Sequence, residues 1–209
     1  MSAILNHAVM EGGLAANQLA IVPKVVVRTE ERKIFDPGEL KRLFPADVAA
    51  LKTIWGSLEM AMAMLIVRDA GLRPSELVAL RWEHWRPKYK GFIVHPRKTA
   101  HKGAKIKAAL VSDFTAKLIA DYAPDLGNVS SWSRVDTLGK QFCRLAEAVV
   151  PLGGRTLYCL RHTANTRLLT AVGDEAAKLV MGHTTDAMTA HYDHPDDVAI
   201  MERARKLVK

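Results

Sequence analysis

The sequence predicts a mainly α-helical protein with a small antiparallel β-sheet, an α+β fold. Most of the chain shows apolar residues at helical spacing between capping residues, glycines and prolines, which is typical of helices joined by turns. Two short β-prone stretches, "GFIVHP" and "AKIKAALV", flank a basic run and predict a hairpin. Apolar residues make up 49% of the chain, and no apolar run reaches the roughly 18 residues that a membrane span needs, so the composition is that of a soluble globular protein.

The first 35 residues are predicted to precede the main domain. Residues 1–20 indicate a helix end followed by a turn at "EGG", and residues 21–35 indicate an extended linker. The stretch "DPGEL" then has the pattern of a helix start, with Asp36 as N-cap, proline at the first helical position and glutamate three residues after the cap.

Helices are predicted for most of the remaining chain. Two of them, at residues 46–55 and 57–70, lie on either side of Gly56. The second is apolar on nearly all sides, as expected of a central core helix, and Gly71 would close it in the left-handed conformation. The elements expected after it are hairpin strands at 91–96 and 104–111 and helices at 113–122, 135–150, 157–172, 174–182 and 195–208.

Charge and cysteine content suggest a partner and a location. The chain has 30 basic and 22 acidic residues, a formal net charge of +8. This favours a polyanion partner, because neutralised phosphates release counterions, although a basic protein with no nucleic-acid role fits almost as well. Cys143 and Cys159 are too few for a disulfide framework, and no signal peptide precedes them, so a reducing, cytoplasmic location is expected.

The stretch "AGLRPSEL" places Arg73 where the core helix ends and Pro74 begins another helix. An arginine before proline is pushed out of the helical conformation and stands beside a helix N-terminus, whose free N–H groups also attract anions. Glu76 would either brace the guanidinium or stabilise the helix start. The alternative is an ordinary surface arginine after a turn.

The predicted hairpin tip is a flexible basic finger. Its cations are Arg97, Lys98, His101, Lys102, Lys105 and Lys107. Such a finger can reach a phosphate or a DNA groove, and a lysine on it can donate a proton. Solubilising charge on an exposed turn is the alternative.

The stretch "LYCLRH" places Tyr158 and Arg161 three residues apart, on one helix face, with His162 turned partly away. Arg161 lies among apolar positions and needs a partner, since burying a lone guanidinium is very costly. A phosphate is one candidate partner, and an internal salt bridge is the other.

The stretch "GHTTDAMTAHYDH" places Tyr192 nine residues after His183. A tyrosine hydroxyl can be a covalent nucleophile when cations or a base assist it, although a lone histidine and tyrosine are more often structural. Zinc on His183, His191 and His194 is disfavoured, because no paired cysteines accompany them and the spacing matches no familiar ligand set.

Together and in this order, these stretches resemble the tyrosine recombinase, or phage integrase, family over residues 36–194. "GLRPSEL" is similar to the first arginine box of the family. "LRHTANTRLL" followed by "GHTTDAMTAHY" is similar to its second box, including the spacing from histidine to tyrosine. The resemblance implies the tyrosine recombinase catalytic-domain fold, and a site-specific DNA recombinase or integrase of a mobile genetic element that works through a 3′-phosphotyrosyl intermediate.

The resemblance also implies residue roles. Arg73 and Arg161 would clamp the scissile phosphate and stabilise charge on its oxygens. His183 would hydrogen-bond the phosphate, Tyr192 would attack the phosphorus, and Lys102 would protonate the leaving 5′ oxygen. The supporting residues are Glu76, Lys98 and His162. The resemblance implies neither a metal nor a cofactor.

Two positions differ from a simple match to the family. The hairpin lysine has two candidates, since Lys102 is at the usual distance from the second strand and Lys98 is the runner-up. The family usually has histidine where this chain has Tyr158, and often aspartate where it has Cys159. A phenol donates a hydrogen bond to phosphate but is not a cationic acid near pH 7, so we expect an active enzyme in which Tyr158 replaces one donor.

The implied organisation has four parts. Residues 1–20 would be the remnant of an N-terminal core-binding domain and 21–35 a linker, before a catalytic domain at 36–194 and a tail helix at 195–209. The implied partners are double-stranded DNA, further copies of the chain in a tetramer on DNA, and accessory DNA-bending proteins, with no membrane. Without the rest of the core-binding domain, we expect weak DNA binding, because about half of the phosphate contacts would be missing.

Three other functions compete with this interpretation. A type IB topoisomerase uses the same phosphate chemistry without pairing two sites. A non-catalytic DNA-binding regulator with this fold would explain Tyr158, but Arg73, Arg161 and Tyr192 argue against it. A helix-turn-helix repressor is disfavoured by the predicted hairpin between helices.

Overall fold

The computed structural model describes residues 2–20, 33–95 and 106–172, together with residues 202 and 205. The chain divides into two compact units, Met1–Glu31 and Arg32–Lys209. The first contains helix α1 (Ser2–Met10), a turn through the two glycines of "EGG" and a single 3₁₀ turn, η1 (Gln18–Ala20). The predicted helix end and turn are therefore confirmed.

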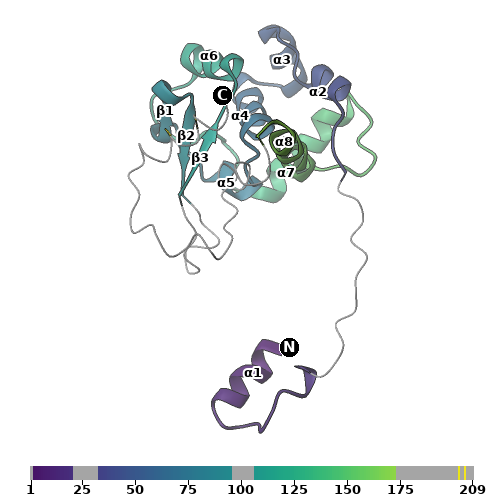
Figure 1. Ribbon diagram of the computed structural model, residues 1–209. Coiled ribbons are helices and arrows are strands. Elements are labelled where there is room, and N and C mark those ends of the chain that lie inside the picture. The colour runs from purple at the N-terminus through teal and green to yellow at the C-terminus, as the bar shows by residue number, and fades with distance from the viewer. Residues whose placement is uncertain (1, 21–32, 96–105, 173–201, 203–204, 206–209) are drawn as a thin grey trace. The chain divides into compact units, whose positions relative to one another are not determined.

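The second unit is mainly helical with one small sheet, which confirms the predicted fold class (Figure 1). Its helices are α2 (Pro37–Leu43), α3 (Val48–Trp55), α4 (Leu58–Ala70), α5 (Pro74–Val78), α6 (Asp113–Tyr122), α7 (Val135–Glu147) and α8 (Leu157–Val172). Its strands are β1 (Trp85–Arg86), β2 (Gly91–Val94) and β3 (Lys107–Leu110), and two 3₁₀ turns, η2 (Trp82–His84) and η3 (Pro87–Tyr89), flank β1.

The helix boundaries follow local chemistry. At the start of α2, the Asp36 carboxylate accepts the Glu39 N–H at 2.8 Å, and the Glu39 carboxylate accepts the Asp36 N–H at 3.0 Å. This is the predicted capping box, which satisfies two N–H groups that a helix start otherwise leaves unpaired. Gly56 and Gly71 end α3 and α4 with φ of 75° and 61°, where a side chain would be strained.

Helix α4 is the centre of the core. Every residue from Met60 to Val67 is buried, and the helix packs against α3, α6, α8 and β3 (Figure 1). The prediction of a core helix that is apolar all round is therefore confirmed. In the described part of the chain no single helix is long and apolar enough to span a membrane, while α3 and α4 pass that test only as a pair bent by 96°.

The sheet has strand order β1-β2-β3 and is antiparallel throughout. In the hairpin, Gly91 pairs with Leu110 and Val94 pairs with Lys107. All eight residues of β2 and β3 are buried, because one face joins the main core and the other forms a small second cluster around Ile93. The sequence predicts this hairpin but not β1, whose two residues are too short for a recognisable pattern.

Several predicted features lie outside the described residues. These are most of the linker, the hairpin tip at 96–105, the helix predicted at 174–182 and most of the tail. Phe35, at the end of the predicted linker, is buried against the main core.

Candidate active site

Arg73 lies in the junction between α4 and α5. Its backbone is extended, with φ −67° and ψ 145°, as expected for a residue that precedes proline. The side chain is 41% exposed, and its NH1 donates to Glu76 Oε1 at 2.9 Å. A guanidinium has no acceptor with which to cap a helix, so the Glu76 N–H bonds instead to the Arg73 carbonyl, at 2.9 Å.

Glu76 is the buried carboxylate at the centre of this region. Its Oε2 accepts from the Arg73 N–H at 2.8 Å and from Lys107 Nζ at 2.6 Å. Burial raises the pKa of this carboxyl, but Lys107 and Arg73 more than offset burial, so the pKa lies below its ordinary value. Glu76 therefore both braces the Arg73 guanidinium and stabilises the helix start.

Lys107 is buried, and its prediction as part of the flexible finger is wrong. It is the first residue of β3, pairs with Val94 of β2 and is 6% exposed. Burial lowers the pKa of its ammonium to about 8, with further lowering by the two nearby arginines and partial compensation by Glu76. The strand predicted at 104–111 contains this residue, but the sequence does not predict its burial or its contact with Glu76; the only signal was a lysine directly before the apolar run "AALV".

Arg161, in the second turn of α8, is only 3% exposed. Its NH1 donates to the Gly71 carbonyl, the residue that ends α4. Burial and then the charge of Arg73 lower the pKa of its guanidinium, while Glu76 acts in the opposite direction. The structure thus brings together the arginines of the two sequence boxes, 88 residues apart in number, because Arg161 binds the carbonyl two residues before Arg73.

Tyr158 is the exposed residue beside Arg161. It precedes Arg161 by one helical turn, is 44% exposed, and interacts electrostatically with Arg161. Its ring centroid lies 5.7 Å from that of His162, which is half-buried. The other predicted site residues lie outside the described residues: Lys98, Lys102, His183 and Tyr192.

The start of α8 is fixed by a second set of contacts, here called the Arg155 clamp: Arg155, Glu39 and the carbonyls that Arg155 binds. Arg155 forms a bidentate ion pair with Glu39 and stacks over the Phe35 ring at 4.5 Å. The carbonyls are those of Ile34, Pro151 and Leu152, at 3.1, 2.6 and 2.8 Å. The clamp ties the chain before α2 to the loop that precedes α8, and so holds the helix that carries Arg161.

Among the described residues, Arg73, Glu76, Lys107 and Arg161 form a cationic cluster, in which Glu76 pairs with Arg73 and Lys107 and also influences Arg161 electrostatically. Taking positive charge out of water is costly, and an anion bound beside these groups would lower that cost. Within the described ranges no group of histidine, cysteine and acidic residues could hold a metal ion. The arrangement is chemically suited to binding a phosphate or a similar oxyanion.

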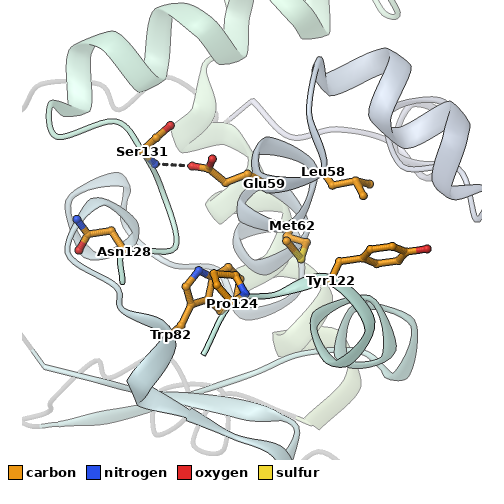
Figure 2. A pocket seen from close by; sticks show the side chains of 8 residues that line it. All are labelled: Leu58, Glu59, Met62, Trp82, Tyr122, Pro124, Asn128 and Ser131. Atoms are coloured by element: carbon orange, nitrogen blue, oxygen red, sulfur yellow. Dashed lines mark hydrogen bonds between the residues drawn. The ribbon is translucent and has the colours of Figure 1, made fainter. Parts of the chain in front are cut away.

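A separate pocket of 360 Å³ lies near the N-terminal end of α4, whereas Arg73 follows its C-terminal end. Figure 2 shows its largely apolar lining, together with Glu59, whose carboxylate accepts the Ser131 N–H at 2.6 Å. A helix of 13 residues is about 20 Å long, so this pocket is distinct from the cationic cluster.

The sequence profile of the Phage integrase family matches residues 35–198, well over half of the chain. The chain therefore belongs to the phage integrase family, and the predicted family and its range are confirmed. Comparison with curated protein sequences finds no match.

Solved structures show the same fold at low sequence identity. An integrase from mycobacterium phage Brujita matches with a TM-score of 0.58 and 17% identity, over 99% of this chain and 68% of that one. The Tn1549 transposon integrase in complex with transposon right end DNA matches with a TM-score of 0.63 and 20% identity, over 100% of this chain and 77% of that one. A lambda integrase tetramer bound to a Holliday junction matches with a TM-score of 0.59 and 17% identity, over 93% of this chain and 58% of that one. The fold of this chain is thus that of integrase and recombinase structures.

Proposed function

We propose that this chain is a tyrosine-type site-specific recombinase that cuts and rejoins double-stranded DNA through a 3′-phosphotyrosyl intermediate. The observation that carries the proposal is the cationic cluster, where Arg73 and Arg161 lie beside one buried carboxylate in a member of the phage integrase family. Both guanidiniums present planar donors that match phosphate oxygens, and both come from the sequence boxes that resemble the phosphate clamp of the family.

In the proposed reaction, the two arginines hold the scissile phosphate and stabilise the charge that grows on its non-bridging oxygens. The Tyr192 oxygen attacks phosphorus and loses its proton, a Tyr–O–P bond forms, and the P–O5′ bond breaks. Lys102, with Lys98 as the alternative, gives a proton to the leaving 5′ oxygen. Attack of a 5′-hydroxyl on the phosphotyrosine reverses these steps and rejoins the strand, so no external energy source is needed.

Tyr158 and His183 would supply further hydrogen bonds to the phosphate. The exposure of Tyr158, 44%, supports this role because its hydroxyl is available to a ligand outside the core. The lambda integrase tetramer on a Holliday junction supports a tetramer on DNA as the working assembly. Accessory DNA-bending proteins remain part of the proposal through family resemblance alone.

Covalent trapping tests the proposal and requires no defined target site. The full chain is incubated with a pool of nicked duplexes of random sequence, in which the cleaved strand loses a short fragment and cannot be rejoined. We expect a protein–DNA adduct that survives denaturation, and sequencing of the trapped strands would give the preferred site. Tyr192→Phe should abolish the adduct, because the attacking oxygen is gone.

The alternative of a non-catalytic DNA-binding regulator is favoured by Tyr158, which replaces the usual histidine. Selective duplex binding by the wild-type chain with no adduct would support that alternative and contradict the recombinase proposal. An adduct that persists in Tyr192→Phe would contradict the assignment of the nucleophile. Relaxation of supercoiled plasmid without strand exchange between two trapped sites would indicate topoisomerase-like activity instead.

A further inference from the structure

Lys107 belongs to the cationic cluster but to neither arginine box. Its Nζ lies 2.6 Å from Glu76 Oε2, and the side chain is almost fully buried. Glu76 in turn binds Arg73 twice, through the backbone N–H and through NH1. Lys107 thus holds the carboxylate that orients the first arginine of the clamp.

We propose that Lys107 is a positioning residue of the phosphate site: its ammonium holds the Glu76 carboxylate in place for Arg73, and a bound phosphate stabilises that ammonium. The proposal rests on the function proposed above, since it takes the anion to be the scissile phosphate. It is distinct from the hairpin lysine that would protonate the leaving oxygen, because Lys107 is buried in β3 and already bound to Glu76.

The surroundings of Lys107 explain why its charge would depend on the anion. In the part of the chain that the structure describes, the charged groups that act on it are Glu76 and Arg73 of the α5 start and Arg161 of α8. Strand β2 places Val94 opposite Lys107, and α4 packs against β3 with apolar side chains. Two cations therefore repel the ammonium, while one carboxylate attracts it.

Burial lowers the pKa of Lys107 to about 8, Glu76 opposes this in part and the two arginines lower the pKa further, so a fraction of the molecules lacks this charge in mildly alkaline solution. A phosphate between the arginines would neutralise their repulsion and raise the pKa again. Anion binding near pH 8.5 would then be accompanied by proton uptake at Lys107, by linkage.

Calorimetric titration with inorganic sulfate tests this inference. Sulfate resembles phosphate in shape and charge but does not titrate near pH 8, so any proton taken up comes from the protein. The full chain is titrated at pH 8.5 in two buffers with different ionisation enthalpies, which gives the number of protons per bound sulfate. We expect net proton uptake by the wild-type chain, since the lowered pKa of Lys107 leaves part of the population deprotonated at this pH before sulfate binds.

Three variants complete the test. Lys107→Arg keeps its charge at this pH, so proton uptake should vanish while sulfate still binds. Lys107→Met removes the charge, so proton uptake should vanish and sulfate affinity should fall about tenfold. Lys117→Met, which removes an exposed lysine on α6, should leave both quantities as in the wild type. Far-UV circular dichroism checks folding, and if Lys107→Met does not fold, Lys107→Arg alone decides.

The outcomes separate this inference from the function on which it rests. Sulfate binding that Arg161→Ala abolishes, without proton uptake in the wild type, would overturn the role of Lys107 and leave the phosphate clamp intact. Unchanged proton uptake in Lys107→Arg would overturn it as well, because another group would then be titrating. If the wild type does not bind sulfate at all, the phosphate clamp itself is wrong.

Discussion

Two helix starts in this molecule share one sequence pattern and have different consequences. Asp36-Pro-Gly-Glu39 opens α2, and Arg73-Pro-Ser-Glu76 opens α5. In both, the glutamate accepts the backbone N–H of the residue three before it, at 3.0 and 2.8 Å, and in both it is buried, at 8% and 7% exposed. The two starts share this glutamate contact, although only Asp36 also caps its helix with its own side chain.

The difference lies in the charges that meet each glutamate. Glu39 forms a bidentate ion pair with Arg155, and backbone carbonyls accept from the remaining guanidinium donors of Arg155. Glu76 pairs with Arg73 and Lys107, with Arg161 close by, so three of the described cations lie around one carboxylate. The first arrangement is suited to stability, whereas the second is the one that we propose binds a phosphate.

The largest effect on the rate of adduct formation should come from the cationic cluster. Arg161→Ala should reduce covalent adduct formation by about 1,000-fold, because removing one donor to a developing oxyanion typically costs 10²–10³ in rate. Adduct yield against time on the trapped site measures this effect. Arg167→Ala, an exposed arginine on the same helix, is the control and should change the rate by less than about threefold. Equal losses in both variants would mean that Arg161 acts through general DNA attraction rather than at the phosphate.

A substitution in the Arg155 clamp should change stability instead. Arg155→Ala leaves the Glu39 carboxylate buried without its cation, which should lower the free energy of unfolding by about 4 kcal/mol. Urea unfolding monitored by circular dichroism measures the loss. Arg144→Ala, at an exposed position on α7, should change stability by less than about 0.5 kcal/mol. A stable Arg155→Ala variant would mean that the clamp contributes little to the fold.

These two regions also show how far the sequence alone can predict the structure. Capping chemistry is local, so the start at Asp36 and the ends at Gly56 and Gly71 are predictable and are confirmed. The partners of Glu39 and Glu76 are not local: Arg155 and Lys107 come from 116 and 31 residues away. No periodicity in the sequence predicts which buried carboxylate will pair with which cation, so the difference between the two glutamates is seen only in the structure.

The candidate site was predictable to a similar degree. The pairing of Arg73 with Glu76, and the shared helix of Tyr158 and Arg161, follow from spacing along one chain segment. The burial of Lys107 does not, because strand residues that are covered on both faces lose the alternating pattern that marks an exposed side chain. The assignments of Lys98, Lys102, His183 and Tyr192 stay predictions, as they lie outside the described residues.

Acid should weaken the Arg155 clamp over a defined pH range. The ion pair with Arg155 lowers the pKa of Glu39 to about 2 from an ordinary 4.5, so its stabilisation is complete above pH 4.5 and is lost as the pH falls toward 2. The pKa difference corresponds to about 3 kcal/mol. Glu39→Gln should be less stable than the wild type at pH 7 and should show a shallower fall between pH 4.5 and 2. Parallel stability curves for the two proteins would contradict the depressed pKa.

The smallest effect on the rate of adduct formation should come from Tyr158, which is exposed beside the cationic cluster. Tyr158→Phe removes one hydroxyl donor, and a hydrogen bond to a charged group contributes about 1.5 kcal/mol, so adduct formation should fall roughly tenfold. Tyr122→Phe, which removes another exposed hydroxyl on α6, should leave the rate unchanged.

Tyr158→His sharpens this last prediction, because histidine is the usual residue of the family at that position. If the hydroxyl already supplies the needed donor, the histidine variant should form adduct at a rate no higher than the wild type. A rise of several orders of magnitude in the rate of adduct formation would mean that the native site lacks a donor that histidine supplies. The Arg155 clamp has no equivalent test, since Glu39 and backbone carbonyls already accept from the Arg155 guanidinium. We therefore expect a lost donor at the cationic cluster to lower the rate of adduct formation, and a lost partner at the Arg155 clamp to lower stability.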